Sequence, residues 1–255
     1  DFHNGLQFPP DSALSDRHPL RYIKMFYDLH IHSALSPCSD DDMTLNNIVN
    51  MAYIKGLDII AITDHNSVKQ LYHLKEVAKD KVEFVYGVEI QSREEVHILA
   101  YFLGETCLDS IQTFLDDYLI EEPNDEYYFG HQYILDENDK IINEEKRLLI
   151  KSLDLSIREV IRWIHQLGGV AVLAHAMSER FSIMNVFMKI DKDLDIDGIE
   201  VTEIKHQEYL LHQYPYLKKM LWFINSDAHR LDMISEPIHN MDKQNFYEMW
   251  RKRYG

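Results

Sequence analysis

The stretch LDIIAITDH, residues 57–65, decides the fold. Its centre, residues 59–62, is continuously apolar, and such a short run between polar residues is typical of a strand buried on both faces, as in a parallel sheet. Parallel neighbours need crossover connections. Residues 44–56 start with a threonine suited to an N-cap and stop at a glycine, and residues 67–80 form the next expected helix. The region therefore predicts βαβ units.

The same alternation continues on both sides of this stretch. Further strands are expected at 25–31, 82–90, 95–103, 169–176, 196–203 and 221–229, with further helices at 156–168, 181–190 and 207–220. Strands separated by helices of roughly 10–15 residues indicate right-handed crossovers, and this many imply a closed or nearly closed barrel. The sequence therefore predicts an α/β fold of TIM-like barrel type, in one domain from residue 25 to residue 255.

Composition narrows the classes of function. The chain has 255 residues and a formal charge of −17, with 43 acidic against 26 basic residues, so we expect no duplex nucleic acid as a partner. Two cysteines without a pairing pattern suit the cytoplasm. No apolar run reaches the roughly 20 residues of a membrane helix, so no membrane partner is expected. Residues 1–24 lack the apolar core of a signal peptide and are interpreted as an N-terminal extension.

One segment interrupts the alternation. Residues 104–150 hold thirteen acidic and three basic residues, which gives this segment a charge of −10. Within it, the turn-like residues 136–140, DENDK, separate two strand-like runs and predict a hairpin. We interpret the segment as an acidic insertion that covers one edge of the barrel mouth.

Side chains with metal-binding groups fall where the expected strands end. Barrel enzymes place their active sites at the carboxyl ends of the strands. His30 and His32 lie two positions apart on one strand and therefore point to the same face. The full set from the strand ends and the loops after them is His30, His32, Asp40, His65, Glu89, His97, His175, Asp227 and His229.

A single histidine in an apolar strand is more often a hydrogen-bonded core residue than a ligand, but nine such groups change that balance. Burying six imidazoles and three carboxylates without compensation is costly, and divalent cations remove the cost. Mixed nitrogen and oxygen donors match zinc, manganese or iron. Nine ligands exceed the coordination of one ion, so we expect two or three ions, with Glu89 as the bridging ligand.

Such a cluster predicts the reaction. Ions roughly 3.5–4 Å apart lower the pKa of bound water to about 7 and hold both reacting oxygens of a phosphoryl group. We therefore expect phosphoester hydrolysis by in-line attack of a metal-bridging hydroxide, with Glu89 and Asp227 holding the bridged pair. The acid for the leaving group is either His229 or a metal-bound water. Arg180 is the first candidate to bind the phosphate, and Arg230 is the second.

These residues carry a resemblance to a known family. The chain resembles the PHP (polymerase and histidinol phosphatase) domain, and is similar to its stand-alone bacterial phosphoesterases, through the motifs DLHIHS (28–33), CSDDDMT (38–44), AITDHNS (61–67), GVEI (87–90), EVHIL (95–99), LAHA (173–176) and NSDAH (225–229). The resemblance implies a distorted (β/α)7 barrel with a trinuclear metal site at the carboxyl ends of the strands. It also implies three ligand groups: His30, His32, Glu89 and Asp227; Glu89, His97 and His175; and Asp40, His65 and His229.

Two positions depart from the family pattern. Asp40 is followed by Asp41 and Asp42 where family members usually have glycine, and any of the three could be the ligand, although Asp40 fits the spacing to Thr44. His175 is followed by alanine where many members have proline.

The favoured substrate is a small phosphorylated metabolite or a nucleotide, as a phosphomonoester or phosphodiester. One alternative is an exonuclease on short oligonucleotides, which would need a cationic groove. A second is an amidohydrolase, but such enzymes typically carry a metal-bridging lysine and no lysine stands at an expected strand end. A third is a non-catalytic, metal-binding regulatory domain. The sequence leaves the oligomeric state open.

Overall fold

The computed structural model describes residues 24–255, so the expected N-terminal extension lies outside the described residues except for Lys24. The strands are β1 (Lys24–Ile31), β2 (Ile59–Ile62), β3 (Glu83–Gln91), β4 (His97–Phe102), β5 (Tyr133–Leu135), β6 (Ile141–Glu144), β7 (Val170–Leu173), β8 (Gly198–Glu200), β9 (Leu221–Phe223) and β10 (Asn240–Asp242). The α-helices are α1 (Leu45–Lys55), α2 (Leu74–Ala78), α3 (Leu108–Tyr118), α4 (Glu126–Phe129), α5 (Ile157–Gln166), α6 (Ile183–Phe187), α7 (Ile204–Gln213) and α8 (Lys243–Tyr254).

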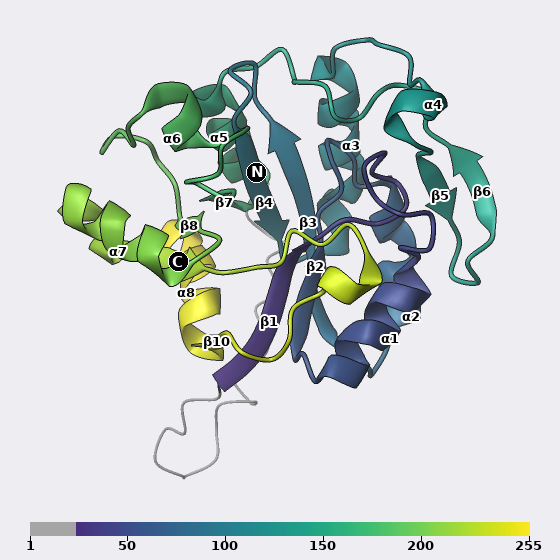
Figure 1. The fold of residues 1–255 in the computed structure, drawn as a ribbon, viewed down its shortest axis with the longest axis horizontal. Coiled ribbons are helices and arrows are strands. Elements are labelled where there is room, and N and C mark those ends of the chain that lie inside the picture. The colour runs from purple at the N-terminus through teal and green to yellow at the C-terminus, as the bar shows by residue number, and fades with distance from the viewer. Residues whose placement is uncertain (1–23) are drawn as a thin grey trace.

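Eight strands form one curled sheet in the order β10-β1-β2-β3-β4-β7-β8-β9 (Figure 1). Neighbouring strands are parallel except at β4, which is antiparallel to both of its neighbours, and at β10, which is antiparallel to β1. An isolated parallel bridge joins Ile31 to Ala228, so the chain after β9 lies beside the end of β1. The predicted α/β fold is confirmed: the chain forms a distorted TIM-like barrel.

Local sequence explains the elements at the start of the barrel. Thr44 caps α1 by accepting a hydrogen bond from the backbone N of Asn47, and Gly56 ends the helix in the left-handed region at φ 79°. All four residues of β2 are buried, as its continuous apolar sequence predicts. Ser156 and Glu159 form a capping box at the start of α5.

The barrel interior is filled by alternate residues of the strands. This inner core includes Tyr27, Tyr101 and Phe223, and it continues into Phe246 and Trp250 of α8. Because β10 pairs with the first residues of β1 and leads directly into α8, this helix closes the end of the barrel opposite the carboxyl ends of the strands. The other faces of the strands pack against the surrounding helices.

The insertion contains α3, α4 and a two-stranded sheet of β5 and β6, so the predicted hairpin is confirmed. The hairpin lies at the edge of the molecule, with α4 beside it (Figure 1). The backbone N of Tyr133 donates to the carbonyl of Ala34 at 2.9 Å, which fastens the hairpin to the loop after β1. That the insertion narrows the mouth of the barrel remains a prediction.

Several helical regions differ from expectation. The helix expected at 67–80 is a 3-10 turn, Lys69–His73, followed by the short α2. The helix expected at 207–220 is broken because Pro215 lacks a backbone N–H, and the remainder is a 3-10 turn. Helices α3, α4 and α8 were not predicted from the sequence. No helix of the described residues is long and apolar enough to span a bilayer.

Candidate metal centre

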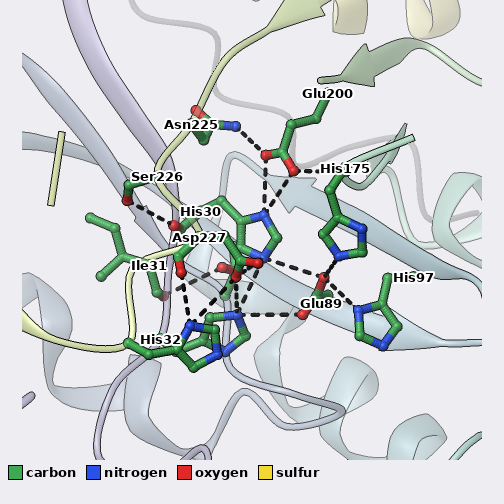
Figure 2. A network of polar contacts seen from close by, with 12 residues as sticks. His30, Ile31, His32, Glu89, His97, His175, Glu200, Asn225, Ser226 and Asp227 are labelled. Carbon is green, nitrogen blue, oxygen red and sulfur yellow. Dashed lines mark hydrogen bonds and ion pairs between the residues drawn. The ribbon is translucent and has the colours of Figure 1, made fainter. Parts of the chain in front are cut away.

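Eight of the nine candidate ligands meet at the rim of the barrel where the parallel strands have their carboxyl ends, and Figure 2 shows His30, His32, His97, His175 and Asp227 around Glu89. Imidazole nitrogens and carboxylate oxygens lie within 4.8 Å of one another in three groups: His30, His32 and Asp227; His65, Glu89 and His97; and His32, His65 and His229. Nε2 of His175 joins the cluster at 3.2 Å from Oε1 of Glu89.

Glu89 lies at the centre of the cluster and is only 1% exposed to solvent. Its two carboxylate oxygens lie within 3.4 Å of a ring nitrogen on each of five histidines, which are His30, His32, His65, His97 and His175. A carboxylate surrounded in this way can share its oxygens between adjacent ions, which is the role expected for it from the sequence.

His97 reaches this rim because β4 runs in the opposite direction to β3. It is the first residue of β4 and pairs with Gln91, the last residue of β3. Its Nδ1 lies 2.9 Å from Oε1 of Glu89, and its Nε2 lies 2.9 Å from Oε1 of Gln91. In a parallel strand the same residue would lie at the opposite end of the barrel.

His30 and His32 point at the same place. Their Nε2 atoms lie 3.2 Å apart, and each is within 3.3 Å of Oδ1 of Asp227. On the far side of the rings, Nδ1 of His30 faces both oxygens of Glu200 at 3.1 Å, and Nδ1 of His32 faces Oγ of Ser36 at 3.0 Å. Because Glu200 accepts and the Ser36 hydroxyl donates onward to Asp64, both Nδ1 atoms are assigned as donors. In the neutral form of both rings, two Nε2 lone pairs then face each other, and a proton or a metal cation between them and Asp227 would resolve this.

Glu200 is an important residue that the sequence analysis missed. It is buried at the end of β8, accepts from the backbone N of His175 at 2.8 Å, and accepts from Nδ2 of Asn225 at 2.6 Å (Figure 2). One carboxylate thus fixes two candidate ligands, His30 and His175. The strand was expected to run to residue 203, so Glu200 was taken as a residue in the middle of the strand instead of at its end. The presence of a carboxylate within the otherwise apolar run GIEV could have indicated a functional residue.

Asp28 and Asp64 support the loops that carry the ligands. Asp28 accepts from both the backbone N and the hydroxyl of Ser226, directly before Asp227. Asp64 accepts from the backbone N and hydroxyl of Ser33. Both are buried, and they fix the two strand-end loops in place.

Burial and close charges shift the pKa values of the cluster in opposite directions. Burial disfavours the charged form of His32, but Asp227 and Glu89 overcome it and raise the pKa of His32 to about 9. Burial, together with the charge on His32, lowers the pKa of His65 far below its usual value and that of His229 to about 4. Burial opposes ionisation of Glu89, yet the surrounding imidazoles hold the pKa of Glu89 well below its usual range.

These properties fit a metal centre. Nδ1 of His175 is buried and has no hydrogen-bond partner among the described residues. Nδ1 of His65 and Oδ1 of Asp227 are also buried, and they face other ligand atoms at 3.2 to 3.3 Å without the alignment of a hydrogen bond. Buried polar atoms are nearly always paired, so unpaired ones that face a cluster of donors need an explanation. Neutral imidazoles and ionised carboxylates are the ligands that zinc, manganese and iron accept.

Two of the candidate ligands have strained backbones. His175 has φ 25° and Asp227 has φ 52°, both in the region that favours glycine. The backbone N of His175 is held by Glu200, and the segment around Asp227 is held by Asp28. Strain of this kind persists where surrounding contacts over-determine it, and it is concentrated at functional sites.

Asp40 and the two arginines lie outside this cluster. The side chain of Asp40 is exposed and joins none of the three ligand groups, although its backbone N donates to the carbonyl of His229 at 3.0 Å. Arg180 is exposed on the segment between β7 and α6. Arg230 is also exposed, but Asp232 occupies its guanidinium with hydrogen bonds of 3.0 and 3.1 Å. Arg180 is therefore the freer of the two candidates for phosphate.

Comparisons with known proteins agree with this geometry. A family model described as the PHP domain matches residues 28–254. A protein of Haemophilus influenzae named 5'-3' exoribonuclease is 24% identical over 250 residues, which cover 80% of this chain and 89% of the relative. An uncharacterized protein of Methanocaldococcus jannaschii is 26% identical over 196 residues, covering 72% of this chain and 85% of the relative.

Solved structures share the fold. A protein from Bifidobacterium adolescentis, named as a metal-dependent phosphoesterase, superposes with a TM-score of 0.62 at 18% identity, covering 89% of this chain and 96% of the other. Endonuclease Q of Pyrococcus furiosus superposes with a TM-score of 0.59 at 20% identity, covering 82% of this chain. The match covers 49% of the endonuclease, so this chain spans about half of its length.

The endonuclease corrects one expectation. Endonuclease Q has also been solved with a 27-mer duplex substrate that has an abasic lesion at the active site. A protein of this fold thus binds duplex nucleic acid, and the exclusion of duplex partners was wrong. Net charge sums over the whole surface, whereas nucleic-acid binding depends on the local field around the site, so −17 is no ground for the exclusion.

Proposed function

This chain belongs to the PHP domain family of metal-dependent phosphoesterases, and we propose that it cleaves terminal phosphodiester bonds of short RNA strands. The observation that supports it most strongly is the convergence on Glu89, whose carboxylate oxygens lie within 3.4 Å of ring nitrogens from five histidines that are far apart in sequence. A site of that donor chemistry is suited to hydrolysis of a phosphoester.

The residues of the chain have separate tasks in this proposal. Divalent ions, when bound, supply an activated water and offset the charge on the phosphoryl oxygens. Glu89 and Asp227 supply the carboxylates, and the surrounding imidazoles complete the ligand set. His229, whose pKa is lowered to about 4 by burial and by His32, is neutral near pH 7 and serves as a nitrogen donor. Arg180 meets a phosphate oxygen that the cluster leaves free.

We propose RNA as the substrate because of the similarity to a relative named 5'-3' exoribonuclease. That relative aligns over 80% of this chain and 89% of its own length, so the similarity extends over most of both proteins. An exonuclease needs an end of a strand to reach the site. The insertion beside the loop after β1 would favour an end over the middle of a long strand.

Charge favours a second candidate, a phosphomonoesterase acting on nucleotides. The insertion alone contributes −10, and an acidic surface repels the successive phosphates of a polymer more than the single phosphate of a nucleotide. Under this alternative the same ligands and Arg180 would act on a terminal phosphate group.

A substrate panel tests both candidates. The metal-loaded protein is incubated with end-labelled single-stranded RNA, the same sequence as DNA, a duplex DNA with an abasic site, and a nucleoside monophosphate. We expect stepwise loss of nucleotides from one end of the RNA, with a rate that falls as salt rises. Release of phosphate from the monophosphate alone would support the second candidate, and cleavage only of the duplex would replace both.

A further inference from the structure

An aromatic side chain covers the metal centre on the side of His97 and has no part in the chemistry above. Phe181 lies in the segment between β7 and α6, six residues after His175. Its ring stacks on the ring of His97, with centroids 4.8 Å apart and planes 4° from parallel. The residue is nevertheless 38% exposed, so it borders both a candidate ligand and solvent.

The position of Phe181 is held by its surroundings. The backbone N of His97 donates to the carbonyl of Phe181 at 2.9 Å. Ser182, the next residue, caps α6 and donates its hydroxyl to the carbonyl of Ser178 at 2.6 Å. Phe181 has φ 55°, a conformation that is unfavourable for a bulky side chain. A strained backbone thus keeps an exposed aromatic ring at the rim.

We propose that Phe181 is the nucleobase platform of this site, on which the base of the terminal nucleotide stacks while its phosphate lies at the metal centre. The inference rests on the proposed function and adds a base-binding subsite to it. Phe181 stacks on the imidazole of His97, and Nδ1 of the same imidazole lies 2.9 Å from Oε1 of Glu89, so the aromatic ring is one side chain away from the centre of the cluster. Stacking on a flat ring tolerates every base, as an exonuclease requires.

The neighbouring cation agrees with this placement. Arg180, adjacent to Phe181, is exposed and forms no ion pair with any residue in the described part of the chain. Arg180 and Phe181 together present a positive charge and an aromatic face at one point of the rim. A nucleotide offers the two complementary groups, a phosphate and a base.

The test uses two matched substrates and two variants. One RNA carries a normal nucleoside at the end where cleavage starts, and the other carries an abasic ribose there. We expect Phe181→Ala to lower kcat/KM about tenfold for the normal RNA and to leave the abasic RNA unchanged, because base stacking is lost. Phe181→Tyr should keep the wild-type preference. Phe187→Ala changes another partly exposed phenylalanine, on α6, and should have no effect.

A binding measurement separates this idea from a shielding role. RNA with a terminal 2-aminopurine should lose fluorescence on binding to the wild type but not on binding to Phe181→Ala. Equal losses of activity on both RNAs, together with a lower metal content, would show that Phe181 only shields His97 and would overturn the proposal. If the wild type hydrolyses no phosphoester, the proposed function fails, whereas the fluorescence assay still decides whether the platform exists.

Discussion

The two ends of the barrel differ in how their charged and ionisable side chains are arranged. At the carboxyl end, imidazoles and carboxylates crowd around Glu89, Nδ1 of His175 is buried without a hydrogen-bond partner, and His175 and Asp227 have positive φ. At the amino end, Arg253 of α8 pairs with Asp195 and Asp197 through three hydrogen bonds of 2.7 to 3.0 Å.

The amino end is held together mainly by apolar packing and ion pairs among its own residues, although Nε1 of Trp250 and Oδ2 of Asp242 are buried there without a hydrogen-bond partner. Trp250 and Phe246 are fully buried in the inner core, and the hydroxyl of Tyr254 donates to the carbonyl of His165 at 3.0 Å. The amino end therefore contributes to the stability of the fold through contacts within the chain. The carboxyl end keeps a strained backbone and a crowded set of ligand atoms, which bound metal ions would stabilise. Substitutions at the two ends should therefore separate stability from activity.

The largest effect is expected from Glu89→Ala. Removing the carboxylate that contacts five imidazoles should lower hydrolysis of an aryl phosphate on the order of a thousandfold or more, because the shared ligand of the cluster is lost. Activity is measured together with metal content by elemental analysis.

The same variant tests whether ions stabilise this end. Chelation should lower the melting temperature of the wild type, since ligands that bind only the folded state stabilise it, and should change that of Glu89→Ala much less. Full activity of the variant, or an equal chelator response in both proteins, would contradict the assigned role of Glu89.

An intermediate effect is expected from Glu200→Gln, which keeps the shape but lets an amide N–H face Nδ1 of His30. The imidazole then favours a proton on Nε2, so metal affinity should fall about 10-fold to 100-fold with little loss of fold stability. Metal affinity is measured by competition with a chromophoric chelator. Asp197→Asn is the matched control, because Asp197 also faces a histidine, with Oδ2 2.9 Å from Nε2 of His165, but lies away from the metal centre. If metal affinity fell by a similar factor in Asp197→Asn, the proposed role of Glu200 in orienting His30 would be contradicted.

The smallest effect is expected from Arg253→Gln at the amino end. Asp197 is mostly buried and would lose its charged partner, so the free energy of unfolding should fall by about 2 kcal/mol. Urea denaturation measures this change, and kcat/KM should stay at the wild-type value. A variant that loses activity while folded would show that the two ends are coupled.

Strand-end ligands could be predicted because they depend on local sequence. His30 and His32 share a face through strand alternation, and His65 follows a strand whose apolar run is unmistakable. The position of His97 required knowledge of the direction of β4, which is set by pairing with β3 and β7 rather than by its own residues.

Other features escaped because they depend on loop geometry or on weak patterns. The side chain of Asp40 is exposed and its role as a ligand stays a prediction, since no periodicity fixes where a loop residue points. Helix α8 is polar over most of its length, and only Phe246, Met249 and Trp250 mark its buried face. The insertion was recognised by its charge, whereas its effect on the mouth is a property of tertiary packing.

The parallel bridge between Ile31 and Ala228 joins the first strand of the barrel to the segment after its last parallel strand, and this limits when the metal centre can form. His30 and Asp227 belong to one ligand group but are separated by nearly the whole described chain. Synthesis must therefore reach Asp227 before His30 and His32 can meet the third member of their group. Nascent or prematurely ended chains would expose half of a binding site, and ion loading becomes a late event that reports the completed barrel.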